Sequence, residues 1–125
     1  MLSQMPVWPV LPTKDLGRAK NFYENILGLK LVSVNEAMGC QIYETGGTKI
    51  QVYKTGANHG ENTAATFHVT NIDSEVEYLK EKGVVFEEYN MPGFKTQNGI
   101  ATLETEKSAW FKDPDGNILC LHQTT

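Results

Sequence analysis

The 125-residue chain has few cysteines and no long apolar run. Two cysteines, Cys40 and Cys120, are too few for a secreted disulfide scaffold and lack the close spacing of a zinc or redox motif, so reduced thiols are expected. No apolar stretch approaches the roughly 20 residues that cross a bilayer, and Met1–Pro9 has no basic start before an apolar run. We therefore expect a cytoplasmic protein with no membrane partner.

The chain also lacks an excess of basic residues, because its net charge is −4. Residues 1–60 carry six Lys and Arg against four Asp and Glu (+2), and residues 61–125 carry five against eleven (−6). Nucleic-acid binding requires Lys and Arg clustered on one face. Neither half provides such a cluster, so we expect no nucleic-acid partner.

The chain does contain enough apolar material for a core, with 40% hydrophobic and 10% aromatic residues. Its length is that of one domain, since domains most often have about 100 to 150 residues. Within residues 1–125, one order of elements occurs twice, with module one at about 5–55, a polar linker at about 55–63 and module two at about 64–123. The expected order in each module is strand, helix and three strands.

Module one contains a helix signal after its first strand, because Asp15 precedes apolar residues at helical spacing and Gly28 is a typical helix stop. Gly46-Gly47 joins two strand-like runs in a hairpin where positive φ is accessible. The four predicted strands are Val7–Leu11, Leu29–Val34, Gln41–Thr45 and Thr48–Lys54.

Module two repeats these signals. Ser74 and Glu77 have capping-box spacing, Gly83 is the helix stop, and Asp113–Gly116 forms the last turn. The strand-like runs of module two are Ala64–Val69, Val84–Tyr89, Ile100–Leu103, Ala109–Lys112 and Ile118–His122, one more than the four of module one. Asn90–Gly99 is rich in Pro, Gly and Asn and is predicted to be either a mobile flap or a plain surface loop.

The two modules align on their landmarks, since Asp15-Leu16 to Gly28 matches Asn71-Ile72 to Gly83 within one residue. Each module of about 55 residues would bury too little surface to be stable alone, so we expect a shared sheet and cavity. Strand alternation then places a set of side chains on the sheet face away from the helices. The aligned pairs on this face are Trp8 with Ala64, Gln51 with Cys120, and Tyr53 with His122, and Thr66 and His68 join them.

Two motifs carry a family resemblance. Asp15–Leu29 (DLGRAKNFYENILGL) resembles the first-helix signature of the vicinal oxygen chelate superfamily, and Asp113–Asn117 (DPDGN) resembles its closing turn. The superfamily includes glyoxalase I, bleomycin-resistance proteins and extradiol dioxygenases. The resemblance implies an α+β fold in which two βαβββ modules form a U-shaped mixed sheet with helices on its convex face. It also implies a homodimer with a ligand cavity.

The metalloenzymes of that family hold a divalent ion at four cavity positions, which by the resemblance fall on Trp8, Gln51, Ala64 and Cys120. Trp8 and Ala64 have no ligand atom, Gln51 offers a weak amide oxygen and Cys120 offers a soft thiolate. We therefore expect no metal cofactor. The one alternative is an atypical site, for which the candidates are His68, Cys120 and His122.

The remaining candidates are reactive or aromatic. Cys120 with His122 on the same face has the residue types of a nucleophile and its base, although a buried inert cysteine has the same pattern. Trp8, Tyr53 and Trp110 either stack on a flat ligand or fill the space of a lost metal site. Glu104 and Glu106 fit either an acid/base pair or an exposed strand.

Three functions follow from these alternatives. We expect metal-independent binding of a small organic molecule, aromatic in character, as in bleomycin resistance. The first alternative is a metal-dependent glyoxalase-like lyase or dioxygenase relative with an atypical site. The second is a non-catalytic structural or regulatory dimer. The cavity residues that we expect to contact a ligand are Trp8, Gln51, Tyr53, Thr66, His68, Trp110, Cys120 and His122.

Overall fold

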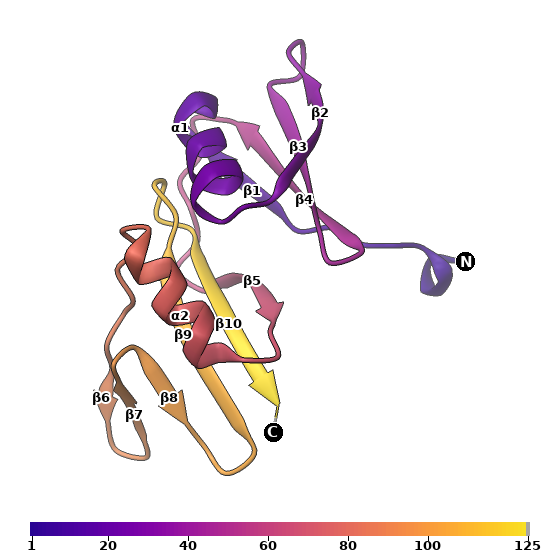
Figure 1. Cartoon of the computed structure of the whole chain (residues 1–125). Coiled ribbons are helices and arrows are strands. Elements are labelled where there is room, and N and C mark those ends of the chain that lie inside the picture. Colours follow the sequence, from indigo (N-terminus) through magenta and orange to yellow (C-terminus); the bar gives the residue numbers. More distant parts are fainter. Residues whose placement is uncertain (125) are drawn as a thin grey trace. The chain divides into compact units, whose positions relative to one another are not determined.

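In the computed structural model, which describes residues 1–124, each half of the chain has a strand followed by a helical segment and further strands (Figure 1). Three strands follow the helical segment in the first half and five follow it in the second. The chain divides into two units, Met1–His59 and the unit from Gly60 onward, which we call module one and module two. The division falls inside the segment 55–63 that we predicted to be a linker. Each module has its own mixed sheet and its own helix, so the predicted α+β class is confirmed.

Module one has a four-stranded sheet in the order β1-β4-β3-β2, in which β1 is parallel to β4 and the other pairs are antiparallel. Its strands are β1 (Val10–Thr13), β2 (Lys30–Asn35), β3 (Cys40–Thr45) and β4 (Thr48–Lys54). Its helical segments are η1 (Leu2–Gln4), α1 (Leu16–Lys20) and η2 (Asn21–Ile26), the last of which is a π-helix. Gly46 and Gly47 both have positive φ in the β3–β4 turn, as predicted.

The helix of module one follows from its capping and its apolar spacing. The Asp15 carboxylate accepts the backbone N–H of Arg18 at 3.0 Å, and Gly28 ends the helix at φ 77°. Phe22 and Tyr23 are buried, and the Tyr23 ring lies 5.6 Å from that of Tyr43 on β3. These rings pack the helix against one face of the sheet.

The first strand was predicted too early. β1 begins at Val10 instead of Val7 and continues through Pro12 to Thr13. Pro12 is tolerated because β1 pairs only with β4 in this sheet, so the other edge of the strand needs no N–H donor. Trp8 therefore precedes the strand, next to Pro9, whose carbonyl accepts the backbone N–H of Gln51 at 3.0 Å.

Module two has a six-stranded sheet in the order β5-β10-β9-β8-β7-β6, with β5 parallel to β10. Its helix is α2 (Ile72–Glu81), and Gly83 follows it at φ 95°. The strands are β5 (Thr63–His68), β6 (Asn90–Met91), β7 (Phe94–Gln97), β8 (Ile100–Thr102), β9 (Glu106–Lys112) and β10 (Ile118–Thr124).

The segment between α2 and β8 differs from the prediction. Residues 84–89 form no strand and make one isolated β-bridge, from Phe86 to Phe111. The buried side chains of Val84 and Phe86 hold this segment in place, so it needs no continuous row of strand hydrogen bonds. The predicted loop 90–99 contains the β6–β7 hairpin. Thr96 closes this hairpin, since its backbone N–H donates to the Tyr89 carbonyl at 2.9 Å and its hydroxyl accepts the Tyr89 N–H at 2.7 Å.

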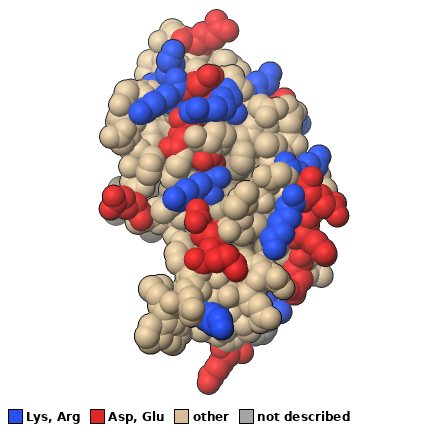
Figure 2. All heavy atoms as spheres, turned by 90° about the vertical axis from the view of Figure 1, so that its left-hand side faces the viewer, with Lys and Arg blue, Asp and Glu red and all other residues tan. Residues whose placement is uncertain are grey.

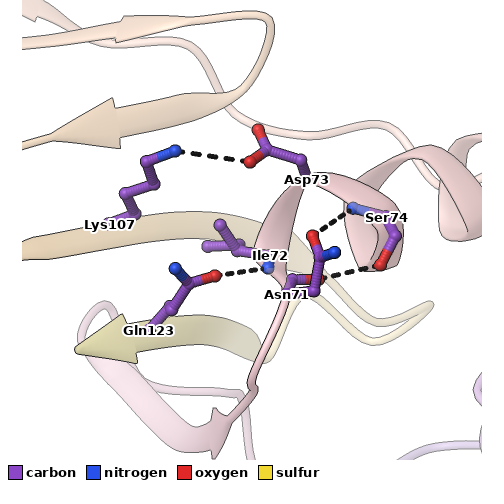
Figure 3. A network of polar contacts seen from close by, with 6 residues as sticks. All are labelled: Asn71, Ile72, Asp73, Ser74, Lys107 and Gln123. Carbon is purple, nitrogen blue, oxygen red and sulfur yellow. Dashed lines mark hydrogen bonds and ion pairs between the residues drawn. The ribbon is translucent and has the colours of Figure 1, made fainter. Parts of the chain in front are cut away.

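The predicted capping box at Ser74 and Glu77 was also wrong, because the N-cap of α2 is Asn71. The Asn71 side chain accepts the Ser74 N–H at 3.2 Å, which is the arrangement that Asp15 makes in module one. Figure 3 shows how the same end of α2 is tied to the sheet. Gln123 on β10 accepts the Ile72 N–H at 2.7 Å, and Lys107 on β9 pairs with Asp73 at 3.3 Å.

The strand registers show that the modules are true repeats. Val10 lies opposite Gln51 in module one, and Thr66 lies opposite Cys120 in module two. The predicted equivalence of Gln51 with Cys120 is therefore consistent with both sheets. The antiparallel pairs extend it, because Tyr43 lies opposite Ile50 as Phe111 lies opposite Leu119.

The distribution of charge and the length of the helices complete the description of the fold. Figure 2 shows basic and acidic side chains next to one another on the face that it draws. Among residues 1–124, no helix has both the length and the apolar character needed to span a membrane.

Candidate functional site on the open face of module two

Gln123 determines which way the end of β10 faces. Its side chain binds the first turn of α2, so its neighbour His122 lies on the opposite side of the sheet. Cys120 shares the side of His122, whereas Leu119 and Leu121 are buried on the helix side. We call the side opposite α2 the open face; the residues that define it are Thr66, His68, Ser108, Trp110, Cys120 and His122.

The register of three strands brings these residues together in two rows. Cys120 on β10 lies between Thr66 on β5 and Trp110 on β9. His122 lies between His68 and Ser108 in the next row. The structure thus places five of the predicted site residues on one face and fixes the side of Trp110, which alternation alone had left open.

His122 is held by a carboxylate. Its Nε2 lies 2.9 Å from Oε1 of Glu106, and the His68 ring packs on it edge to face with 5.6 Å between centroids. Its Nδ1 is buried and has no hydrogen-bond partner among residues 1–124. A neutral imidazole that donates from Nε2 to the carboxylate leaves Nδ1 as a hydrogen-bond acceptor.

Cys120 is only 5% exposed, and its thiol donates to the Leu121 carbonyl at 3.3 Å. Burial raises the pKa of this thiol, and hydrogen bonds from the Ala109 backbone and the Thr66 and Ser108 hydroxyls offset only part of that effect. A thiol held in its neutral form is a poor nucleophile and a poor metal ligand. The geometry therefore favours the interpretation of Cys120 as an inert buried residue.

Three aromatic rings border the polar residues. The Trp110 ring lies 5.7 Å from Tyr89 and 5.5 Å from Phe94, and those two rings are 5.8 Å apart. Phe94 belongs to the β6–β7 hairpin, so the segment predicted as a flap or loop contributes a ring to this cluster. Edge-to-face and tilted pairs of this kind leave a rigid apolar surface on which a flat molecule can stack.

Two of the three predicted site residues of module one, Gln51 and Trp8, have partners within that module. Gln51 and Tyr53 lie on the side of β4 opposite the buried Ile50 and Val52. Gln51 donates from Nε2 to the Cys40 sulfur at 3.4 Å. The Lys49 ammonium lies 5.4 Å from the centre of the Trp8 ring, which is a cation–π contact.

The four positions that the resemblance assigns to metal ligands do not fit a divalent ion. Trp8 and Ala64 carry an indole and a methyl group, which have no ligand atom. The Gln51 amide is hydrogen-bonded to the Cys40 sulfur, and Cys120 is a neutral buried thiol. Among residues 1–124, no group of three or more His, Cys, Asp or Glu side chains is arranged to hold a metal ion. The atypical candidates His68, Cys120 and His122 share the open face without forming such a group.

The contact of Glu106 with His122 is the part of the site that the sequence does not predict. The sequence pairs Glu106 only with Glu104, and the predicted strand Ala109–Lys112 leaves Glu106 outside it. β9 begins at Glu106, and alternation from Ser108 then places Glu106 on the open face beside His122. The signal was present in the sequence but depended on the start of one strand.

Comparison with known proteins bears on family and fold. The sequence model of the Glyoxalase/Bleomycin resistance protein/Dioxygenase superfamily matches residues 6–121. The chain is similar to the fosfomycin resistance protein FosX from Listeria monocytogenes, at 19% identity over 98% of this chain and 92% of that chain, with a TM-score of 0.75. It is also similar to a putative glyoxalase family protein from Bacillus anthracis, at 15% identity over 100% of both chains, with a TM-score of 0.74. At these identities the structural likeness shows the fold alone.

Proposed function

The chain belongs to the Glyoxalase/Bleomycin resistance protein/Dioxygenase superfamily, and from that premise we propose that it binds a small organic molecule on the open face of module two without a metal ion. The observation that carries the proposal is the meeting of two kinds of side chain on this face. Trp110 brings an aromatic cluster, and His122 brings a polar group that is not saturated by its neighbours. Small-molecule sites typically combine an apolar lining with a few such polar groups.

The aromatic cluster indicates the character of the ligand. Trp110 is partly exposed, so part of its surface remains accessible beside Tyr89 and Phe94. Stacking on such rings favours planar molecules and contributes about 0.5–1.5 kcal/mol beyond the burial of apolar area. We therefore propose an aromatic or otherwise planar ligand. Trp8, Gln51 and Tyr53, which the sequence also predicted to contact a ligand, belong to module one, where Gln51 and Trp8 already have partners.

The donor set argues against the metal-dependent alternative. A lyase or dioxygenase that chelates substrate oxygens through a metal requires several imidazole or carboxylate ligands. The matching positions supply one amide and one neutral thiol with ligand atoms, at Gln51 and Cys120. The homodimer and the cytoplasmic location implied above remain parts of the proposal.

Metal content and melting temperature test this proposal. Protein purified without a histidine tag should carry far less than one metal ion per chain, and its melting temperature should not rise with Ni, Zn, Mn or Fe(II). Phenol, used as an aromatic probe in the presence of EDTA, should raise the melting temperature because a ligand that binds only the folded state stabilises it. About one metal per chain with a rise on metal addition would contradict the proposal and favour the enzyme. No rise with either would favour the structural dimer.

A pair of variants assigns the binding to the open face. Trp110→Leu keeps an apolar side chain but removes the ring, so it should abolish the phenol-dependent rise. Tyr78→Leu removes a ring that is 51% exposed on α2, on the other side of the sheet, and should leave the rise unchanged. Equal loss in both variants would show that phenol does not bind at the open face.

A further inference from the structure

The Glu106–His122 pair has the geometry of an oriented hydrogen-bond acceptor. Glu106 faces the Nε2 of His122 at 2.9 Å, so the proton of the neutral ring is favoured on Nε2, where it is donated to the carboxylate. The lone pair is then on Nδ1, on a ring whose side chain is 20% exposed. The second ring nitrogen of a histidine takes its role from the hydrogen bond that the first one makes.

The Nδ1 atom is the exception in an otherwise satisfied module. It is the one buried side-chain nitrogen or oxygen among residues 1–124 that lacks a hydrogen-bond partner. Buried polar atoms without partners are unusual in proteins and cost stability, so an instance at a candidate site requires an explanation. A ligand that donates to Nδ1 would remove this cost on binding, and the removal would add to its affinity.

Access to His122 passes beside an exposed neighbour. His68 is exposed and lies next to His122 in the register of β5 and β10. Its side chain makes a ring contact with His122 and no hydrogen bond to any of residues 1–124. A ring held by one edge-to-face contact can rotate at low cost, and its rotation would uncover the side of His122 that it covers.

Trp110 lies within reach of the same ligand. Ser108 is directly opposite His122, and Trp110 is the next residue on the same side of β9. Residues in this diagonal relation on neighbouring strands have Cα atoms about 7–8 Å apart. A single aromatic ring stacked beside Trp110 can thus point a substituent at His122.

We propose that His122 Nδ1, held as an acceptor by Glu106, is the anchor for a hydroxyl or N–H group on the ligand of the open face. The ligand class is an aromatic ring that carries a hydrogen-bond donor, such as a phenol. This inference rests on the proposed function and adds to it a chemical requirement that stacking alone does not impose.

Three probes of similar size test the requirement. Phenol carries the ring and a donor, anisole carries the ring and an oxygen without a donor, and toluene carries the ring alone. Binding is followed in EDTA by tryptophan fluorescence and by the ¹⁵N chemical shifts of labelled histidine. Phenol should bind about three- to tenfold more tightly than anisole or toluene, which is the range for one additional hydrogen bond. Phenol alone should shift the His122 Nδ1 resonance.

Variants separate the anchor from the stacking surface. His122→Phe keeps a ring and removes Nδ1, and Glu106→Ala removes the group that orients it; both should bind phenol and anisole equally while anisole affinity is unchanged. Glu104 is an exposed glutamate near Glu106 in the sequence. Glu104→Ala is therefore the matched control and should keep the preference for phenol. Loss of the preference in Glu104→Ala as well would overturn the assignment to Glu106.

The outcomes distinguish the two proposals. Equal affinity of the wild-type protein for phenol and anisole would overturn the anchor and leave the binding function intact. A wild-type His122 protonated on Nδ1, seen directly in the ¹⁵N spectrum, would also overturn the anchor, even if a variant failed to fold. Absence of binding by all three probes would instead contradict the proposed function and, with it, the proposal that His122 anchors the ligand.

Discussion

Modules one and two use the same frame for different contents. Asp15 and Asn71 cap the two main helices by the same hydrogen bond, and Gly28 and Gly83 end them with positive φ. The strands that follow keep the same parallel and antiparallel pairings. These shared features are local signals and ladder bonds that do not depend on what the sheet faces carry.

The two cores differ at matching positions. Tyr43 occupies in module one the position that Phe111 has in module two, and both are fully buried. The Tyr43 hydroxyl donates to Gln41 Oε1 at 2.7 Å, and Gln41 Nε2 donates to the Leu16 carbonyl at 3.2 Å. The residue that matches Gln41 in module two is Ala109. Module one therefore buries a polar chain where module two is apolar.

The sheet faces away from the helices also differ, but here it is module two that has the additional polar group. In module one the side chain of Gln51 is bound to Cys40, and Trp8 is covered by Lys49. The position that matches Tyr53 is His122, which has an unpartnered ring nitrogen. The repeat thus duplicates the scaffold, whereas the buried ring nitrogen without a partner among residues 1–124 lies in module two.

Truncation of the apolar core should have the largest effect on this comparison. Phe111→Ala removes a ring that is 0% exposed and should lower the free energy of unfolding by about 3–5 kcal/mol. Phe22→Ala in module one, at 6% exposure, should cost a similar amount. Urea unfolding followed by circular dichroism measures both. A cost below about 1 kcal/mol for either would show that its helix is not packed on the sheet as described.

Alkaline pH should destabilise the protein through a buried residue of module one, Tyr43. Burial, together with the nearby charge of Glu24, raises the pKa of Tyr43 from 10.0 to about 12. Because the folded state holds this proton more tightly, the stability is fully present below pH 10 and is lost as the pH rises towards 12. The loss amounts to about 2–3 kcal/mol at most, from 1.36 kcal/mol per pKa unit.

The matched variant is Tyr43→Phe, which gives module one the residue of module two. It should remove this alkaline loss and cost a smaller, pH-independent amount through the hydrogen bond to Gln41. Urea unfolding between pH 9 and pH 11.5 makes the comparison. An unchanged alkaline loss in Tyr43→Phe, with Tyr78→Phe as the exposed control, would show that other groups cause it.

Removal of the caps should have the smallest effect and should be equal in the two modules. Asp15→Ala and Asn71→Ala each delete the acceptor of one helix N–H and should cost about 1 kcal/mol. Ser74→Ala is the control, because it deletes the residue that the sequence had indicated as a cap. A larger cost for Ser74→Ala than for Asn71→Ala in thermal melts would restore the predicted capping box.

The sequence was sufficient where the chemistry is local. The turn at residues 113–116 was predicted from its residue types, and Asp113 does accept the N–H groups of Asp115 and Asn117 at 2.9 Å each. The Gly46-Gly47 hairpin and both helix stops depend in the same way on a few adjacent residues. These features require no knowledge of which strand lies next to which.

The sequence was insufficient to predict contacts that depend on the register of paired strands. The side of Trp110 follows from its position opposite Cys120, and the contact of Glu106 with His122 follows from where β9 begins. The β6–β7 hairpin depends on Thr96 binding Tyr89 seven residues earlier, in a segment whose composition is typical of a loop. Such contacts need the pairing of strands that the residue pattern alone does not specify.

Every binding prediction above depends on the proposal that the open face of module two binds an aromatic molecule without a metal. A phenol titration of ¹⁵N-labelled protein in EDTA, followed by amide chemical shifts, tests it most directly. We expect saturable shifts at Thr66, Trp110 and Cys120 and none on the exposed face of α2. An absence of saturable shifts on β5, β9 and β10, or their appearance only after a divalent metal is added, would contradict it.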